Sequence, residues 1–373
     1  MKRTYYILFV PVFLLFIGCR ENYDPPVNSL PNSFLVVEGV LNVGSDSTTI
    51  HLTRTFGLDQ HATVKAENNA HLNVEGKDNT TSLLFGAGNG NYVSANLNLV
   101  ANKEYRLRIK TTDGKEYLSD YVKAKITPAI DSISWRQDDK GMQIYANAND
   151  LLNDTKYYRW EYEETWEIRS HMSSSIIYEN GVIRRRIFPQ EDVSVCWKYH
   201  SSTDILLANS LRLGSDLISD APLVLIPDGT EKLGVRYSIL VRQYALEEEA
   251  YNFFELMKKN TENIGSLFTP QPSELRGNIH CVTNPAEYVV GYVTASTIVA
   301  KRLFIAAAQV PQWPYIIICP SVNVPNNSDS INYAVNTLGL MPVYSASADF
   351  VFSTPECVDC TTRGGSIHRP LYW

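Results

Sequence analysis

A short run of glutamates beside Trp160 and Trp166 is the feature of the sequence most suggestive of chemistry. The run consists of Glu161, Glu163, Glu164 and Glu167. Two carboxylates that face a sugar across a cleft can cleave a glycosidic bond. The run falls in a predicted strand, where odd and even residues point to opposite faces, so the four carboxylates cannot all converge. We interpret it as a solvated edge beside buried aromatic residues, and keep a surface glycan-active hydrolase as the alternative.

The cysteines form a second group with chemical potential. The chain has six cysteines, and besides Cys19 these are Cys196, Cys281, Cys319, Cys357 and Cys360. Because the five are odd in number, at most two disulfides can form within the chain and one thiol is left over.

Cys357 and Cys360 form a Cys-x-x-Cys pair, which can be a disulfide, a redox pair or half of a zinc site. An exported protein favours a structural disulfide, because nothing keeps its thiols reduced. We predict that Cys357 bonds to Cys360. A bridge from either of them to Cys281 or Cys319 is the alternative.

Other catalytic patterns are missing from the sequence. It contains no Gly-x-Ser-x-Gly turn, no His-Glu-x-x-His helix and no Walker loop, and the glycine-rich stretch 86–90 is typical of a hairpin. We therefore expect no catalytic residue, no metal and no cofactor. The sequence indicates a binding protein and not an enzyme.

Two stretches are candidates for a binding surface. Arg184, Arg185 and Arg186 follow the Asn-Gly turn at 180–181 and predict an exposed hairpin arm, which could meet anionic lipid or a receptor loop. Trp313 and Tyr315 lie between two apolar runs and could stack on a sugar or fill a partner's groove. Packing into the core is the interpretation that we favour for both aromatic residues, with a binding surface as the alternative.

The N-terminus carries the most specific signal. Lys2 and Arg3 precede an apolar run at 5–17, and the small Gly18 comes directly before Cys19. The run is too short to span a bilayer as a helix, which needs about 20 residues. We predict a cleaved signal peptide at 1–18 and acylation of Cys19, as in bacterial lipoproteins.

Residues 19–32 carry three prolines and no hydrophobic period, so they predict an extended tether between the lipid and a folded domain. The fold that follows reads as mainly β. Strand patterns at 34–40, 49–53, 71–76 and 105–110, with a turn at Asp113-Gly114, predict an Ig-like or transthyretin-like β-sandwich over residues 33–127.

The rest of the chain, 128–373, predicts a second and larger β-rich domain. Strand patterns recur at 157–162, 164–168, 237–242 and 287–292. Between 246 and 260 the apolar residues return at helical spacing, with glutamates at the start and lysines at the end, which indicates one helix packed on the sheets.

Charge excludes one class of partner. The chain of 373 residues has 33 Lys+Arg against 40 Asp+Glu, a formal net charge of −7. Phosphate binding needs clustered cations, and the sequence has no long cationic block. We expect no nucleic acid partner.

Several stretches together resemble a known family. They are Cys19, Leu-Val-Val-Glu-Gly at 35–39, Leu-Thr-Arg at 52–54, Asp-Gly-Lys-Glu-Tyr at 113–117, Ile-Asp-Ser-Ile at 130–133, Arg-Tyr-Ser-Ile at 236–239, the helix, the run 272–281 and Cys-Val-Asp-Cys at 357–360. The chain is similar to Bacteroidota outer-membrane lipoproteins of unknown function, commonly encoded beside TonB-dependent receptors. The resemblance implies a lipid-anchored accessory protein of the outer membrane, with a TonB-dependent receptor and a glycan or other nutrient as its partners. An adhesin or surface scaffold is a further alternative.

Overall fold

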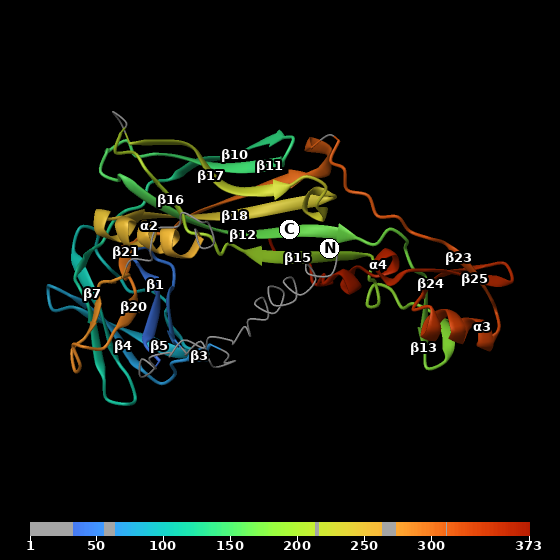
Figure 1. Cartoon of the computed structure of the whole chain (residues 1–373), viewed down its shortest axis with the longest axis horizontal. Helices are drawn as coiled ribbons and strands as arrows, with labels where there is room; N and C mark the ends of the chain where they lie inside the picture. The colour runs from blue at the N-terminus through green and yellow to red at the C-terminus, as the bar shows by residue number, and fades with distance from the viewer. Residues whose placement is uncertain (1–32, 56–63, 213–215, 263–273, 311) are drawn as a thin grey trace, which may run out of the picture.

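The computed structural model describes residues 33–55, 64–212, 216–262, 274–310 and 312–373. Its fold is mainly β, as the sequence predicts. Figure 1 shows three parts along the long axis: a first sandwich, a second sandwich and a smaller lobe at the far end, here called the far lobe. The proposed signal peptide, tether and acylated Cys19 fall outside the described residues and stay predictions.

The first sandwich consists of two layers of one continuous twelve-stranded sheet. Its strands are β1 (Leu35–Asn42), β2 (Thr48–Arg54), β3 (Lys65–Ala66), β4 (His71–Gly76), β5 (Thr81–Gly88), β6 (Asn91–Ser94), β7 (Glu104–Lys110), β8 (Glu116–Ser119), β9 (Val122–Lys123), β19 (Ile279–Cys281), β20 (Val289–Gly291) and β21 (Thr294–Ser296). β5 joins the layers, because its first half pairs with β4 and its second half with β6. Apolar side chains from both layers, such as Ile50, Leu72 and Ile109, fill the core.

The first sandwich differs from the predicted domain 33–127. Residues 279–296, assigned by the sequence to the second domain, return and complete it. β20 and β21 pair in parallel with β1, and β19 pairs with β8. Gly291 allows this contact, since a Cβ there would lie 2.1 Å from the Val37 carbonyl oxygen. The second domain is therefore not one contiguous stretch.

The second sandwich packs a three-stranded sheet on a five-stranded sheet. The smaller sheet is formed by β10 (Ile130–Asp138), β11 (Gly141–Asn149) and β17 (Leu217–Pro227), and the larger by β12 (Tyr157–Arg169), β15 (Val195–Ser201), β16 (Leu206–Asn209), β18 (Arg236–Leu246) and β22 (Val299–Ala306). Short 3₁₀ turns, η2 (Glu231–Leu233) and η3 (Ala307–Gln309), follow β17 and β22. Trp160, Tyr158 and Tyr237 are almost completely buried in its core.

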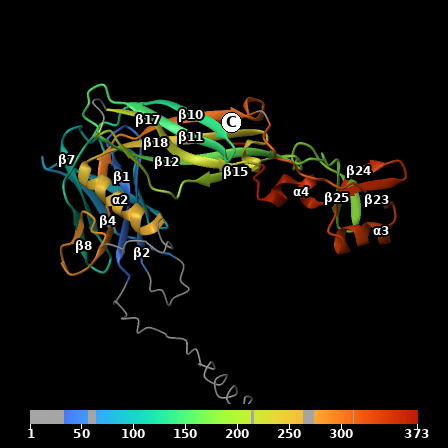
Figure 2. The same cartoon turned by 45° about the horizontal axis from the view of Figure 1, so that its top comes forward.

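The predicted helix exists as α2 (Glu248–Glu262), two residues later than expected at each end. Its buried Ala250 and Tyr251 pack against Tyr157 and Leu246 of the larger sheet. Figures 1 and 2 both show α2 where the first sandwich meets β18. Among the helices of the described ranges, none is long and apolar enough to cross a membrane.

The far lobe combines two distant stretches of chain. Its elements are β13 (Ile176–Glu179), β14 (Val182–Arg185), β23 (Val322–Pro325), α3 (Ser328–Asn332), the π-helical turn η4 (Tyr333–Thr337), β24 (Met341–Ala346), β25 (Asp349–Ser353) and α4 (Pro355–Val358). The 3₁₀ turn η5 (Cys360–Arg363) then leads the chain back to the second sandwich.

The hairpin turns follow the predictions in position. β13 and β14 are joined by Asn180 and Gly181, both with positive φ. At the β7–β8 turn, only Gly114 has positive φ (84°), so the expected tight two-residue turn is wrong there. The connection is longer: the Thr111 N–H donates to the Lys115 carbonyl oxygen, and the Gly114 N–H donates to the Thr111 carbonyl oxygen.

Candidate functional site

A cleft of about 950 Å³ lies between the two sandwiches. Its floor is the outer face of β12 and β18, one wall is β1 with β20, and the other wall is α2. The loop after β15 also lines the cleft. Clefts between domains, of roughly 300 to 1,000 Å³, are where proteins usually bind small molecules.

Charge pairs within β12 and between β12 and β18 form the floor of the cleft. Arg159 faces Tyr244 across the two strands, and Glu161 faces Arg242. The Glu161 carboxylate pairs with Arg159 and accepts a hydrogen bond from the Tyr244 hydroxyl at 2.7 Å. Arg242 pairs with Glu163 at 2.8 Å. The floor is therefore a polar surface of planar donors and acceptors whose charges largely cancel.

Arg159 is the most enclosed charge of the floor. Its guanidinium lies 5.1 Å from the Tyr244 ring centroid and 4.6 Å from that of Phe254. Burial lowers the pKa of Arg159, although such a group stays protonated at neutral pH. A cation held between two rings, away from water, interacts strongly with any polar group that enters beside it.

The α2 wall is apolar and aromatic. Phe253, Phe254 and Met257 line it, and the Phe253 ring lies 5.1 Å from that of Tyr292, which follows β20. Burial raises the pKa of Tyr292 to about 12, so its hydroxyl remains a neutral donor and acceptor. This wall can pack against the face of a ring or an alkyl chain.

The mouth of the cleft carries free polar groups. Glu38, Asp204, Ser47 and Thr203 line it, and all four are exposed. In the described residues, Glu38 and Asp204 form no ion pair. The cleft therefore offers acceptors at its mouth, a balanced polar floor and an apolar wall, which suits a polar ligand that contains rings. Its described lining contains no His, Cys or Lys.

The glutamates of the sequence run do not form one site. Glu161 lines the cleft and Glu163 lies on the same face of β12, whereas Glu164 lies on the core side, as the parity argument predicts. The buried Glu164 carboxylate accepts bonds from Lys232, His200 and Tyr237 at 2.6 to 2.9 Å. The prediction of a solvated edge is wrong for Glu164, because protein side chains, rather than water, donate the hydrogen bonds to its carboxylate.

Glu167 is also buried, so it too departs from the predicted solvated edge. Its carboxylate accepts the indole N–H of Trp373 at 3.1 Å and pairs with Arg169 at 2.6 Å. The outward side of β12 is here covered by the C-terminal residues. Thr165 likewise shares a hydrogen bond with the Tyr372 hydroxyl.

The cationic run lies in the far lobe, but only part of it is free. Arg184 pairs with Glu191 through both carboxylate oxygens, at 2.7 and 2.9 Å, and with Glu179. The prediction of an exposed arm is wrong for Arg186. This side chain is buried and donates to the Ser174 hydroxyl at 3.0 Å. Burial lowers its pKa. Within the described part of the chain, Arg185 alone of the three remains an unpaired, exposed cation.

The Arg184 pair makes the far lobe sensitive to acid. Its hydrogen bonds lower the pKa of the Glu191 carboxyl from 4.5 to about 2. A carboxyl whose pKa is lower in the folded than in the unfolded protein stabilises the fold at a pH above its unfolded pKa. This contribution is lost as the pH falls from 4.5 toward 2. We expect hydrogen exchange in β13 and β14 to rise in that window. In Arg184→Gln this extra rise should disappear, and an unchanged pH profile would contradict the assignment.

Trp313 and Tyr315 pack against the protein, as the favoured interpretation predicts. Both are half-buried, and the Trp313 indole donates to the Thr230 carbonyl oxygen at 2.7 Å while its ring packs on the second sandwich core. The Tyr315 hydroxyl accepts from Arg363 at 3.0 Å. The two aromatic residues hold their segment against the protein.

The predicted Cys357–Cys360 disulfide is wrong. Cys360 bonds to Cys196, and Cys357 bonds to Cys319, the latter as the alternative allowed. The extended Asp359 separates α4 from η5, so the two cysteines enter different apolar clusters. Cys281, a candidate for bridging, is free and buried, which matches one leftover thiol.

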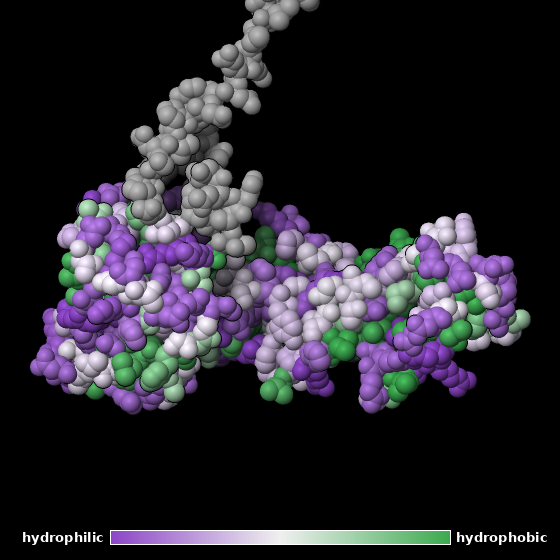
Figure 3. Space-filling view, turned by 90° about the horizontal axis from the view of Figure 1, so that it is seen from below, coloured by the Kyte–Doolittle hydropathy of each residue, from purple (hydrophilic) through white to green (hydrophobic). Residues whose placement is uncertain are grey.

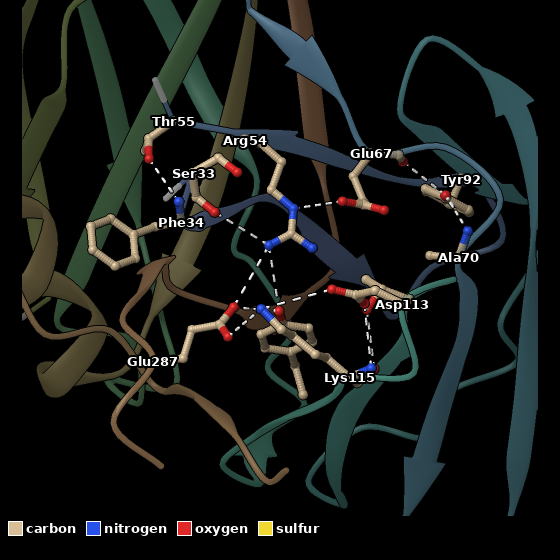
Figure 4. Close-up of polar contacts among 12 residues, drawn as sticks. Ser33, Phe34, Arg54, Thr55, Glu67, Ala70, Tyr92, Asp113, Lys115 and Glu287 are labelled. Carbon is tan, nitrogen blue, oxygen red and sulfur yellow. Dashed lines mark hydrogen bonds and ion pairs between the residues drawn. The ribbon is translucent and has the colours of Figure 1, made fainter. Parts of the chain in front are cut away.

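One buried charge cluster was missed by the site predictions. Figure 4 shows Arg54 at the end of β2, with Glu67, Lys115 and Glu287 around it. Arg54 pairs with Glu67 at 2.5 Å and lies 3.7 Å from Glu287, which also binds Lys115 at 2.6 Å. Tyr117 donates to Glu287 at 2.6 Å, and burial raises the pKa of this tyrosine well above its usual value.

This cluster ties the returning segment to the first sandwich, since Glu287 comes just before β20. A signal for it existed in the sequence, because Arg54, Lys115 and Tyr117 belong to the stretches that carry the resemblance. Among the described residues, no group of His, Cys, Asp and Glu side chains could hold a metal ion.

The fold and the cleft define a mainly β protein of two sandwiches with a ligand-sized hollow between them. The chain belongs to the DUF4249 family, a domain of unknown function, whose model matches residues 20–302. All described residues that line the cleft fall inside this span. No curated protein matches the chain.

Proposed function

We propose that this protein is a lipid-anchored, non-catalytic binding protein of the outer membrane, which captures a nutrient in the cleft and assists a TonB-dependent receptor in its uptake. The observation that carries the proposal is the cleft of about 950 Å³ between the sandwiches. It combines an aromatic wall with a charge-balanced floor, which is the mixture expected for orienting a polar ligand.

The cleft favours a neutral ligand rich in hydroxyl groups, such as an oligosaccharide. Arg159 and Arg242 already have carboxylate partners, so no free cation is left on the floor for an anionic ligand. The paired groups keep further donors and acceptors that hydroxyls can share. Phe254 and Met257 offer apolar surface for the carbon face of a sugar ring.

The N-terminal sequence supports the lipid anchor. The sequence Phe16-Ile17-Gly18-Cys19 has the form of a lipoprotein cleavage site, and the family match begins at residue 20, directly after Cys19. Several acyl chains on one cysteine give lasting attachment, because each buried methylene contributes about 0.8 kcal/mol. A protein held at the membrane in this way can pass its ligand to a receptor in the same membrane.

Blocking the cleft should weaken capture. Ser47 and Thr203 both line the cleft, are exposed and make no side-chain hydrogen bond in the described structure, so Ser47→Trp and Thr203→Trp should fold normally. In calorimetric titration of the mature protein with an oligosaccharide panel, we expect each variant to bind its best ligand at least about tenfold more weakly than wild type, about 1.4 kcal/mol.

Leu152→Trp is the matched control, because Leu152 is 87% exposed and does not line the cleft. It should bind like the wild type. Equal affinity of all three variants and the wild type, or no binding to any oligosaccharide, would contradict the proposal. Release of shorter oligosaccharides that is lost in Glu161→Gln would favour the hydrolase instead.

A further inference from the structure

A second surface, separate from the cleft and independent of the proposed function, lies on residues 312–320. This segment leads from η3 of the second sandwich to β23 of the far lobe, and Figure 1 draws it as a plain connection outside every sheet. Its side chains alternate between exposed and half-buried, as in a strand that lies on a surface. Ile316 and Ile318 point outward, 81% and 90% exposed.

The inward side chains fix the segment in place. Trp313 is bonded to the Thr230 carbonyl oxygen, and Tyr315 to Arg363. Cys319 is tied by its disulfide to Cys357. A segment held at both ends in an extended form loses little further entropy when a partner binds to it.

The backbone of this segment has unused hydrogen-bonding groups. Within the described residues, no acceptor is found for the amide N–H groups of Ile316, Ile317, Ile318 and Cys319. The Ile318 carbonyl oxygen has a Cys357 sulfur 3.8 Å away, but a disulfide sulfur has no hydrogen to donate. An extended edge with free backbone groups and exposed apolar side chains is a template for strand addition.

We propose that residues 315–319 form a docking strand, on which an extended segment of another protein adds as a β-strand. Backbone hydrogen bonds would give the affinity, and contacts with Ile316 and Ile318 would select apolar side chains at alternate positions of the partner. Pro314 and Pro320 lack an N–H group and so bound the docking strand at both ends. Figure 3 shows apolar surface on the narrow part of the molecule and on the far lobe.

The size of the docking strand argues for a short peptide segment rather than a second copy of this chain. Five residues extend about 17 Å. A stable dimer needs roughly 1,200 to 2,000 Å² of buried surface, more than one short strand provides. The docking strand also lies beyond the family match, which ends at residue 302.

The test uses a fluorescent probe peptide, acetyl-Lys-(Thr-Val)₃-Lys-amide, added to the mature protein. We expect a dissociation constant below about 1 mM by fluorescence anisotropy. In hydrogen exchange, the amides of residues 316–319 should exchange rapidly in the free protein and become protected by the peptide. A peptide N-methylated at every residue has no backbone N–H group to donate and should bind at least about tenfold more weakly.

The double variant Ile316→Lys/Ile318→Lys should also weaken binding about tenfold, because two charges replace the apolar contact. The control is Leu151→Lys/Leu152→Lys, which removes two equally exposed apolar residues elsewhere, 89% and 87% exposed. Three results would each overturn the proposal: no binding at 1 mM, equal binding of the N-methylated peptide, or slow exchange of these amides in the free protein.

Discussion

Arg54→Met is expected to lower the free energy of unfolding of the first sandwich by about 3 to 5 kcal/mol. The Arg54 side chain is only 8% exposed, and so is that of Glu287. Methionine can fill the space of the arginine stem, but it leaves Glu67 inside the protein without its cation and Glu287 with Lys115 alone. An unpaired buried charge costs far more than the pair itself contributes.

Urea unfolding can localise the effect, because all six tryptophans lie outside the first sandwich. They are Trp135, Trp160, Trp166, Trp197, Trp313 and Trp373. Arg54→Met should therefore shift the transition seen by far-UV circular dichroism more than the one seen by tryptophan fluorescence.

Arg136→Met serves as the control for Arg54→Met. Arg136 also pairs with an acid, Asp220, but its side chain is 62% exposed. Water already solvates such a pair, so its loss should change stability little. The same small shift in both variants would show that the Arg54 cluster does not hold the first sandwich together.

Removing the Cys196–Cys360 disulfide is expected to have an effect of similar size. The two residues are 164 positions apart, and closing so long a loop restricts the unfolded chain by about 5 kcal/mol in the chain-entropy model. Both sulfurs lie in the core of the second sandwich, so alanine is the appropriate replacement. Here the tryptophan fluorescence transition should move to lower urea.

The second disulfide provides an internal comparison. Cys319 and Cys357 are 38 positions apart, so replacing both by alanine should cost about 1 kcal/mol less than replacing Cys196 and Cys360. Peptide mapping without reduction should recover these two linked pairs. A peptide with Cys357 bonded to Cys360 would contradict the structure.

The elements that the sequence predicted best are those specified by local patterns. The alternation at 105–110 appears as β7, with every second side chain buried, and the helical spacing appears as α2. The Asn180-Gly181 turn closes β13 and β14 as expected. In each case the residues that determine the element are neighbours along the chain.

The elements that sequence reasoning missed depend on contacts between distant residues. Val289 pairs with Leu35 across most of the chain, and a three-residue parallel strand such as β20 carries no pattern of its own. The cysteines show the same limit, since Cys357 and Cys360 separate into two clusters that only the folded chain defines.

The cleft could not be predicted for the same reason. Glu161 drew attention because of its neighbours in sequence, yet its partners in the cleft, Arg159 and Tyr244, matter because β12 pairs with β18. Glu38 reaches the same cleft from the first sandwich. Only the arrangement of three separate elements, β1, the β12–β18 pair and α2, creates the hollow.

The most direct test of the account is mass spectrometry of the protein isolated in mild detergent from its native membranes. We predict a chain that begins at Cys19 with acyl chains attached, together with a small molecule that denaturation releases. The molecule should be absent from Ser47→Trp/Thr203→Trp and present in Leu152→Trp. A chain without acylation at Cys19, or a wild-type protein that carries no more bound molecule than the blocked variant, would contradict the account.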